Sequence, residues 1–202
     1  DERYREHLVE NVLEPLNNRK EVRQRLASCR VYVGTVASLS SKTELFKLKR
    51  FDVAIVDEAT QILEPQLLWI LTAKSSDGQN SIGKFILIGD HKQLPAVVLQ
   101  SQEESEVHDE GLRNIGLLNL KDSLFERLYR FHLAEGDSPA LDMLCRQGRM
   151  HPGVASFLNQ AFYGGKLMPV GLSHQLEEIS SPVLFIPSRR DTGSLSGKTN
   201  DY

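Results

Sequence analysis

The sequence is poor in cysteine and contains no long apolar run. Its two cysteines, Cys29 and Cys145, lie far apart and outside any CxxC spacing, which suits a reducing compartment and provides no framework for a metal. The apolar run at residues 85–88 is much shorter than the roughly 20 residues that a membrane-spanning helix requires. Residues 1–20 also lack the apolar centre of a signal peptide. We therefore expect an intracellular protein, cytoplasmic or nuclear, with no membrane partner.

A large excess of charge of one sign is absent as well. The 24 Lys and Arg residues nearly balance 27 Asp and Glu residues, and the net charge of −3 argues against a non-specific polycation. The charges are unevenly distributed, because residues 1–50 carry 11 basic and 7 acidic side chains whereas residues 51–140 carry 7 and 15. The basic segment is compatible with a nucleic-acid groove and equally with the solvated faces of helices.

Short apolar segments separated by helical patterns predict an α/β fold with a parallel sheet. Strands are expected where apolar and β-branched residues cluster, at residues 30–36, 51–56, 84–88, 141–144 and 183–186. Helices are expected where apolar residues recur at helical spacing, at residues 2–28, 65–71, 121–129 and 153–162. The acidic stretch at residues 100–111 has few apolar side chains, so we expect a mobile loop there.

Two acidic residues, Asp57 and Glu58, follow the strand expected at residues 51–56. Parallel sheets bind ligands beyond the carboxyl ends of their strands. Neighbouring residues at a strand end point to opposite sides, so one carboxylate can hold Mg²⁺ while the other orients or deprotonates a water. This arrangement is typical of the Walker B segment of nucleotide hydrolases. A helix N-cap with a charge that stabilises the helix dipole is the alternative explanation.

A second polar segment, residues 89–95 (GDHKQLP), follows the strand expected at residues 84–88. A neighbouring parallel strand delivers its polar groups to the same edge of the sheet. Gln93 would then be able to hydrogen-bond a terminal phosphate. A Gly-Asp turn with exposed polar side chains is the alternative explanation of this heptad.

Four segments taken together resemble superfamily 1 helicases, in the 5′–3′ branch that includes the RNA-decay helicases, senataxin and the replication nuclease-helicases. Residues 57–61 (DEATQ) resemble motif II, residues 89–95 resemble motif III, and residues 147–152 (QGRMHP) resemble motif IV. Residues 33–38 (VGTVAS) are similar to the segment before motif II that contacts nucleic acid. The resemblance implies a RecA-like P-loop NTPase fold and a motor that hydrolyses ATP and moves on single-stranded DNA or RNA.

The resemblance also implies roles in ATP hydrolysis, with ATP and Mg²⁺ as the groups bound. Asp57 would coordinate Mg²⁺, and Glu58 would activate the attacking water. Gln93 would sense the γ-phosphate, and Gln147 would belong to the same phosphate-sensing set. Arg149 would reach across from the second RecA-like domain as an arginine finger, because guanidinium forks match phosphate oxygens.

Further residues are implied at the connection to nucleic acid. Gln61 and Asp90 would belong to the phosphate-sensing set and link it to the nucleic-acid groove. Thr35 and Ser38 would contact the backbone phosphates of a single strand, as hydroxyl groups commonly do. Packing between a strand and a turn is the alternative explanation for these two hydroxyl groups.

The resemblance divides the chain into three parts. Residues 1–28 would be a helical stalk returning from an inserted domain, residues 29–136 the carboxyl-terminal part of a first RecA-like domain, and residues 137–202 the start of a second. The phosphate-binding loop GxxxxGK[ST] is lacking, since residues 193–199 (GSLSGKT) have one residue too few between their glycines. We expect the rest of the same polypeptide to carry this Walker A loop and motifs V and VI.

Gly148 departs from the family pattern, which has an aromatic residue beside the motif IV arginine. If that ring stacks on the nucleotide base, this chain has lost the stack. Three functions remain open. The first is the motor, the second is a non-catalytic nucleic-acid-binding relative, and the third is another P-loop ATPase that acts on protein.

Overall fold

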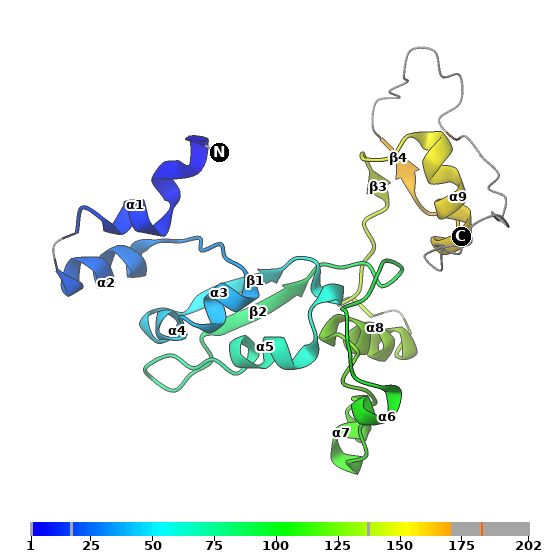
Figure 1. Ribbon diagram of the computed structural model, residues 1–202, viewed down its shortest axis with the longest axis horizontal. Coiled ribbons are helices and arrows are strands. Elements are labelled where there is room, and N and C mark those ends of the chain that lie inside the picture. The colour runs from blue at the N-terminus through cyan, green and yellow to red at the C-terminus, as the bar shows by residue number, and fades with distance from the viewer. Residues whose placement is uncertain (1, 17, 137, 171–182, 184–202) are drawn as a thin grey trace, which may run out of the picture. The chain divides into compact units, whose positions relative to one another are not determined.

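The computed structural model describes residues 2–16, 18–136, 138–170 and 183. The chain divides into two compact units, Asp1–Leu141 and Asp142–Tyr202. Each unit combines helices with a pair of parallel strands (Figure 1). The α/β fold class predicted from the sequence is thereby confirmed. Within the described ranges, no helix has the length and apolar character needed to cross a membrane.

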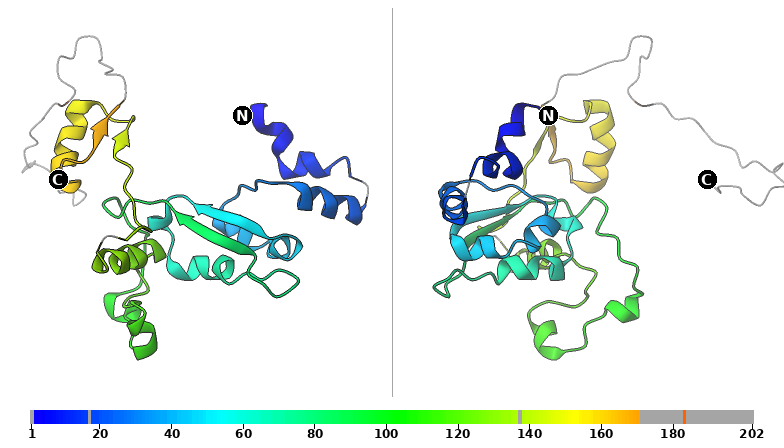
Figure 2. Two further views of the ribbon diagram at one scale, coloured as in Figure 1. Left: turned by 180° about the vertical axis from the view of Figure 1, so that it is seen from behind. Right: turned by 60° about the vertical axis from the view of Figure 1, so that its left-hand side comes forward.

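The first unit is built on two parallel strands, β1 (Phe51–Val56) and β2 (Ile82–Leu87). They lie side by side in both views of Figure 2. Their register places Ile55 opposite Ile86. Helix α5 (Glu64–Leu71) lies between them in the chain, as predicted, and carries a proline in its first turn, where no backbone N–H is needed. This strand–helix–strand order brings the carboxyl ends of β1 and β2 to the same edge.

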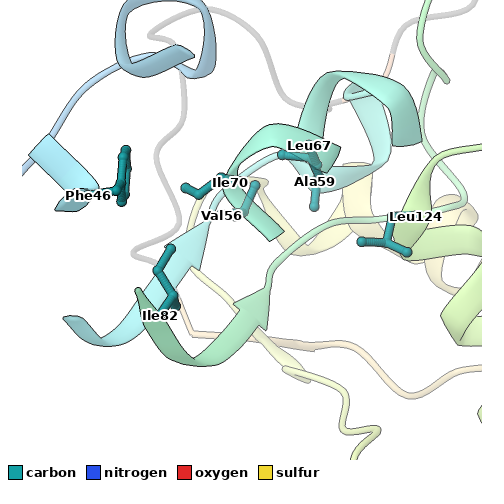
Figure 3. Packing of buried hydrophobic residues seen from close by; sticks show 7 residues of the cluster. All are labelled: Phe46, Val56, Ala59, Leu67, Ile70, Ile82 and Leu124. Atoms are coloured by element: carbon teal, nitrogen blue, oxygen red, sulfur yellow. The ribbon is translucent and has the colours of Figure 1, made fainter. Parts of the chain in front are cut away.

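One face of this strand pair forms the hydrophobic core. The buried cluster joins helix α4 (Glu44–Leu48), both strands, the 3₁₀ helix η2 (Ala59–Gln61) after β1, and helices α5 and α8 (Leu124–Ala134). Its members are Phe46, Val56, Ala59, Leu67, Ile70, Ile82 and Leu124 (Figure 3). The Phe46 ring lies 5.5 Å from Trp69 and 5.6 Å from Phe51, within the range of favourable aromatic contact. Buried Ser81 donates a hydrogen bond to the carbonyl of Phe46 at 2.8 Å. The start of β2 is thus fixed to α4.

The opposite face of the strand pair is exposed. Val53 and Ile55 of β1 expose 43% and 65% of their surface, and Ile86 of β2 exposes 43%. These side chains alternate with those of the core, as the pleat of a strand requires. In the part of the chain that the structure describes, the two strands are therefore buried on one face only.

The strand predicted at residues 30–36 is also wrong. Residues 31–35 have no regular secondary structure, and helix α3 (Val36–Ser40) begins where the strand should end. Val31 and Val33 are 78% and 93% exposed. β-branched residues favour a strand only where a neighbouring strand completes the ladder, and none does so among the described residues.

The basic N-terminal segment is helical, as predicted. Its elements are the 3₁₀ helix η1 (Glu2–His7) and the α-helices α1 (Val9–Leu13) and α2 (Arg19–Ser28). Asn18 caps α2 by accepting a hydrogen bond from the backbone N–H of Glu21 at 3.0 Å. At the other end, Lys49 Nζ donates to the carbonyl of Ala27 at 3.1 Å. A cation is favourable there because it complements the helix dipole.

The acidic stretch at residues 100–111 is not the plain loop that its composition predicts. It contains helix α6 (Gln102–Ser105) and the start of α7 (Glu110–Asn114). Ser101 and Glu104 form a capping box, in which each side chain accepts a hydrogen bond from the other's backbone N–H. Hydrogen bonds from Ser101 lower the pKa of Glu104. Local capping therefore orders a segment that has little apolar surface.

Helix α8 (Leu124–Ala134) closes the first unit and extends further than the helix predicted at residues 121–129. Ser123 and Glu126 form a second capping box, with Ser123 Oγ accepting from Glu126 N at 3.1 Å. The cap sets the start of the helix, and buried Leu124 joins α8 to the core.

The second unit contains two short parallel strands, β3 (Arg146–Gln147) and β4 (Met168–Pro169), and the helix α9 (Pro152–Phe162) between them. The helix matches the prediction, but the strand predicted at residues 141–144 is wrong, because those residues are irregular and pairing begins only at β3. The strand predicted at residues 183–186 lies, but for its first residue, outside the described residues.

Candidate functional site

The polar segments that follow β1 and β2 are joined by backbone hydrogen bonds at the end of the sheet. The backbone N–H of Ile88 donates to the carbonyl of Val56 at 2.8 Å, and the N–H of Ala59 donates to the carbonyl of Ile88 at 2.8 Å. These bonds continue the parallel ladder beyond the last paired residues. Asp57 and Glu58 from one strand and Asp90 from the other therefore lie at the same edge, as the sequence predicts.

Glu58 has an unusual backbone conformation. Its φ of 51° and ψ of 38° place it in the left-handed region, where it is the one non-glycine residue with positive φ in the described ranges. Its backbone N–H donates to Asp57 Oδ1 at 3.0 Å, and its carboxylate accepts from Gln61 Nε2 at 3.1 Å. Left-handed non-glycine residues cost free energy and occur often at functional sites.

Gly89 allows the two segments to approach closely. A Cβ at this position would lie 2.9 Å from Thr60 Cγ2 and 3.1 Å from the backbone nitrogen of Thr60. Thr60 and the preceding Ala59 are buried, so neither has room to move away. The glycine is thus required by contact between the two chain segments.

Replacing Gly89 with alanine is therefore expected to destabilise the intact protein by about 1–3 kcal/mol, the usual cost of overpacking. Thermal unfolding measures the effect. Gly78→Asn is the matched control: it lies in a turn at φ 79° with open space around it, and asparagine tolerates that backbone conformation. An unchanged unfolding temperature in Gly89→Ala would contradict the close approach.

The segment after β2 is held by its own aspartate and by helix α8. The carboxylate of Asp90 accepts hydrogen bonds from the N–H of Lys92 at 3.0 Å and from Gln93 Nε2 at 2.9 Å. The His91 ring lies 4.1 Å from the ring of Tyr129, centre to centre. Burial, with a smaller effect of Lys92, lowers the pKa of His91. Gln93 is exposed, and the hydrogen bond from its amide to Asp90 closes the turn.

The segment after β1 is also attached to α8, through a buried ion pair. Arg127 Nε donates to Glu64 Oε2 at 2.7 Å, and the side chains are only 15% and 10% exposed. A second nitrogen, Nη2, contacts the other carboxylate oxygen, so the pair is bidentate. Glu64 opens α5, three residues after Gln61. The sequence did not suggest this contact, because its partners are 63 positions apart.

Asp57 suits a magnesium ion. Its exposed carboxylate uses one oxygen to accept the N–H of Glu58. Mg²⁺ prefers oxygen ligands and takes one or two carboxylates together with phosphate oxygens and waters. No cluster of three or more His, Cys, Asp or Glu that would hold a metal alone occurs among the described residues. The donor set therefore fits a metal bound together with a phosphate.

The hydroxyl residues before β1 occupy the start of α3. Thr35 is the N-cap residue, and its Oγ1 accepts a hydrogen bond from the N–H of Ser38 at 3.1 Å. Ser38 Oγ in turn accepts from Lys42 Nζ at 3.3 Å. The packing between a strand and a turn that was the alternative explanation is not found, because Thr35 caps a helix and no strand precedes it among the described residues. All three side chains are exposed, so the capping role leaves them open to solvent.

Gln147 and Arg149 belong to the second unit, and so to a different part of the structure from the edge of β1 and β2. Gln147 is half-buried and its amide bonds to the backbone of Met150. Arg149 is exposed. A Cβ on Gly148 would have only Val170 Cγ2 nearby, at 4.0 Å, so the backbone does not require glycine there.

Comparison with known proteins identifies relatives of the chain. Residues 4–101 match a family described as AAA domain. DNA polymerase alpha-associated DNA helicase A of Saccharomyces cerevisiae is 31% identical over 74% of this chain and 20% of its own length. The DNA replication ATP-dependent helicase/nuclease DNA2 of Gallus gallus is 34% identical over 67% of this chain and 11% of its own. DNA-binding protein SMUBP-2 of Mesocricetus auratus is 33% identical over 75% and 14%. The chain thus spans a fifth or less of these relatives.

Proposed function

We propose that this chain, which belongs to the superfamily 1 helicases in the group of the DNA2 and SMUBP-2 proteins, is part of an ATP-driven motor that moves on single-stranded nucleic acid. The observation that carries the proposal is the common edge at which Asp57, Glu58 and Asp90 follow two hydrogen-bonded parallel strands. Polar groups of this chemistry at such an edge suit phosphate and metal binding.

In this proposal, Asp57 holds Mg²⁺, which when bound neutralises charge on the phosphates. Glu58 accepts a proton from the attacking water as the water oxygen bonds to the γ-phosphorus and the bond to the β-phosphate oxygen breaks. The contact between Gln61 and the Glu58 carboxylate orients that base. Gln93, held by Asp90, places an amide donor where a terminal phosphate is expected.

Arg149 and Gln147 contribute from the second unit. An arginine stabilises the charge that develops during phosphoryl transfer, because its guanidinium binds phosphate oxygens bidentately. In this proposal, hydrolysis therefore depends on residues of both units. The rest of the polypeptide supplies the Walker A loop and motifs V and VI in this proposal.

The single strand contacts Thr35 and Ser38 in our proposal, with Lys42 beside them. Lys42 supplies a positive charge next to two exposed hydroxyl groups. Hydroxyl and ammonium groups recognise backbone phosphates and carry no base specificity. Such contacts suit either DNA or RNA, and we propose a single strand of one of them as the substrate. We also propose that the protein acts inside the cell, in the nucleus or cytoplasm.

The space at Gly148 leads to a prediction about ATP binding. Gly148→Tyr is expected to lower the KM for ATP several-fold, because an aromatic ring stacked on a base contributes about 1–3 kcal/mol in comparable sites. The backbone accepts the change, since no atom lies closer than 4.0 Å to the added Cβ. Steady-state hydrolysis with ATP and GTP measures the effect. Gly148→Ala is the control without a ring, and an unchanged KM in Gly148→Tyr would contradict the stacking role.

Steady-state ATP hydrolysis by the intact protein tests the proposal against its alternatives. Single-stranded DNA or RNA is expected to stimulate turnover, and the stimulation should decrease as salt is added because phosphate contacts release counterions. Strand binding without turnover would instead favour the non-catalytic relative. Turnover that no nucleic acid stimulates would favour an ATPase that acts on protein.

A further inference from the structure

The turn that carries Arg149 is closed by the side chain of Gln147. Gln147 Oε1 accepts a hydrogen bond from the backbone N–H of Met150 at 2.8 Å. Its Nε2 donates to the carbonyl of the same residue at 3.1 Å. The carboxamide therefore satisfies both the donor and the acceptor of Met150, and it joins the two ends of the four-residue segment that contains the arginine.

Both flanks of this segment are anchored. On one side, the carbonyl of Gln147 accepts a hydrogen bond from the N–H of Val170 at 2.9 Å, next to the β3–β4 pair. On the other side, His151 caps α9, with its Nδ1 accepting from the N–H of Gly153 at 3.0 Å. The segment therefore begins on a strand and ends on a helix cap, and both positions are fixed.

The tip of the turn has no comparable support. Gly148 and Arg149 are both exposed, and Arg149 makes no hydrogen bond or ion pair within the described ranges. Gly148 has no side chain to pack against its surroundings, and the nearest atom to an added Cβ is 4.0 Å away. The Gln147 amide is thus the contact that restricts the backbone carrying the arginine.

We propose that Gln147 is a positioning residue, which acts on hydrolysis through Arg149 and not by contact with ATP. This inference rests on the proposed function, in which Arg149 stabilises the transferred phosphoryl group. Fixing the turn before ATP binds reduces the entropy lost when the guanidinium engages the phosphate. Only a carboxamide of this length fits, because glutamate has no donor for the Met150 carbonyl and asparagine is one methylene shorter.

A double-mutant cycle in the intact protein tests the proposal. Gln147→Ala is expected to lower kcat by about 10- to 100-fold, the usual effect of a misplaced catalytic group, without changing the KM for ATP. Arg149→Ala should lower kcat by about 10³-fold or more. Adding Gln147→Ala to Arg149→Ala should cause no further loss, because a residue that acts through the arginine has no effect in its absence.

Three further variants make the test specific. Gln147→Glu keeps the length and the acceptor but loses the donor, so kcat should fall as it does in Gln147→Ala. Gln160→Ala, at an exposed glutamine of α9, should behave as wild type. Gln147→Met keeps the volume without hydrogen bonds, and an unchanged unfolding temperature with a lowered kcat would show that the loss is not one of folding.

The outcomes distinguish the positioning role of Gln147 from the proposed role of Arg149. Losses that add in the double variant, with a raised KM, would overturn the positioning role and show that Gln147 touches the nucleotide. An unchanged kcat in Gln147→Ala would overturn it as well. Wild-type turnover in Arg149→Ala would instead overturn the proposed role of the arginine, and the inference about Gln147 with it.

Discussion

Replacing Glu58 with glutamine is expected to lower ATP turnover by about 10²- to 10⁴-fold, because the amide cannot accept the proton of the attacking water. Nucleotide and strand affinities should stay close to those of the wild type, since the amide keeps the size of the side chain. Single-turnover hydrolysis and equilibrium binding, measured on the intact protein, separate these effects. The exposed Glu103 of α6 provides the control variant Glu103→Gln, which should hydrolyse ATP normally. Normal ATP hydrolysis by Glu58→Gln would contradict the proposed role of Glu58 as the base.

The backbone of Glu58 adds a second, independent expectation. A non-glycine residue in the left-handed region costs about 1–2 kcal/mol, which glycine avoids. Glu58→Gly and Glu58→Ala should therefore both lose ATP turnover, as Glu58→Gln does. Glu58→Gly should nevertheless unfold at a higher temperature than Glu58→Ala. An unfolding temperature of Glu58→Gly below that of Glu58→Ala would show that the φ of 51° causes no strain.

Removing Arg127 is expected to cause the largest loss of stability. Arg127→Met should destabilise the intact protein by about 3–5 kcal/mol, because it leaves the Glu64 carboxylate buried without its partner. The fully bidentate contact and the low exposure of both side chains place the pair in this class. Thermal unfolding or resistance to proteolysis measures the change.

Two comparisons identify the cause of that loss. Arg127→Met combined with Glu64→Leu should recover much of the stability, since no charge then remains buried. Arg130 forms an ion pair with Asp122 and is 49% exposed, so Arg130→Met should cost less than about 1 kcal/mol. Equal losses in Arg127→Met and Arg130→Met would contradict the buried character of the first pair.

The fold class and the edge of the sheet could be predicted because they depend on local patterns. The runs of apolar residues at β1 and β2 end in polar groups, and parallel pairing places those ends together. The resemblance to helicases rests on motifs at that edge and in the second unit. Asp57, Glu58 and Asp90 thus follow strands that the sequence predicted. Thr35 and Ser38 do not, because they lie at the start of helix α3, where a strand was expected.

Local sequence patterns did not predict the long-range contacts. The strand expected at residues 30–36 failed because β-branched residues form a strand only beside a partner, and Val33 has none within the described ranges. The pairing of Glu64 with Arg127 and the ring contact between His91 and Tyr129 depend on how α8 packs, which no local pattern encodes. The roles of the site residues remain predictions that the experiments above address.

We propose that ATP hydrolysis at the edge of β1 and β2 moves the protein along a single strand. The most direct test is ATP-dependent displacement of streptavidin from biotin at either end of single-stranded DNA or RNA by the intact protein. We expect displacement from the 3′ end, as 5′–3′ movement requires, and none with Glu58→Gln. ATP hydrolysis without displacement from either end of either strand would contradict the account.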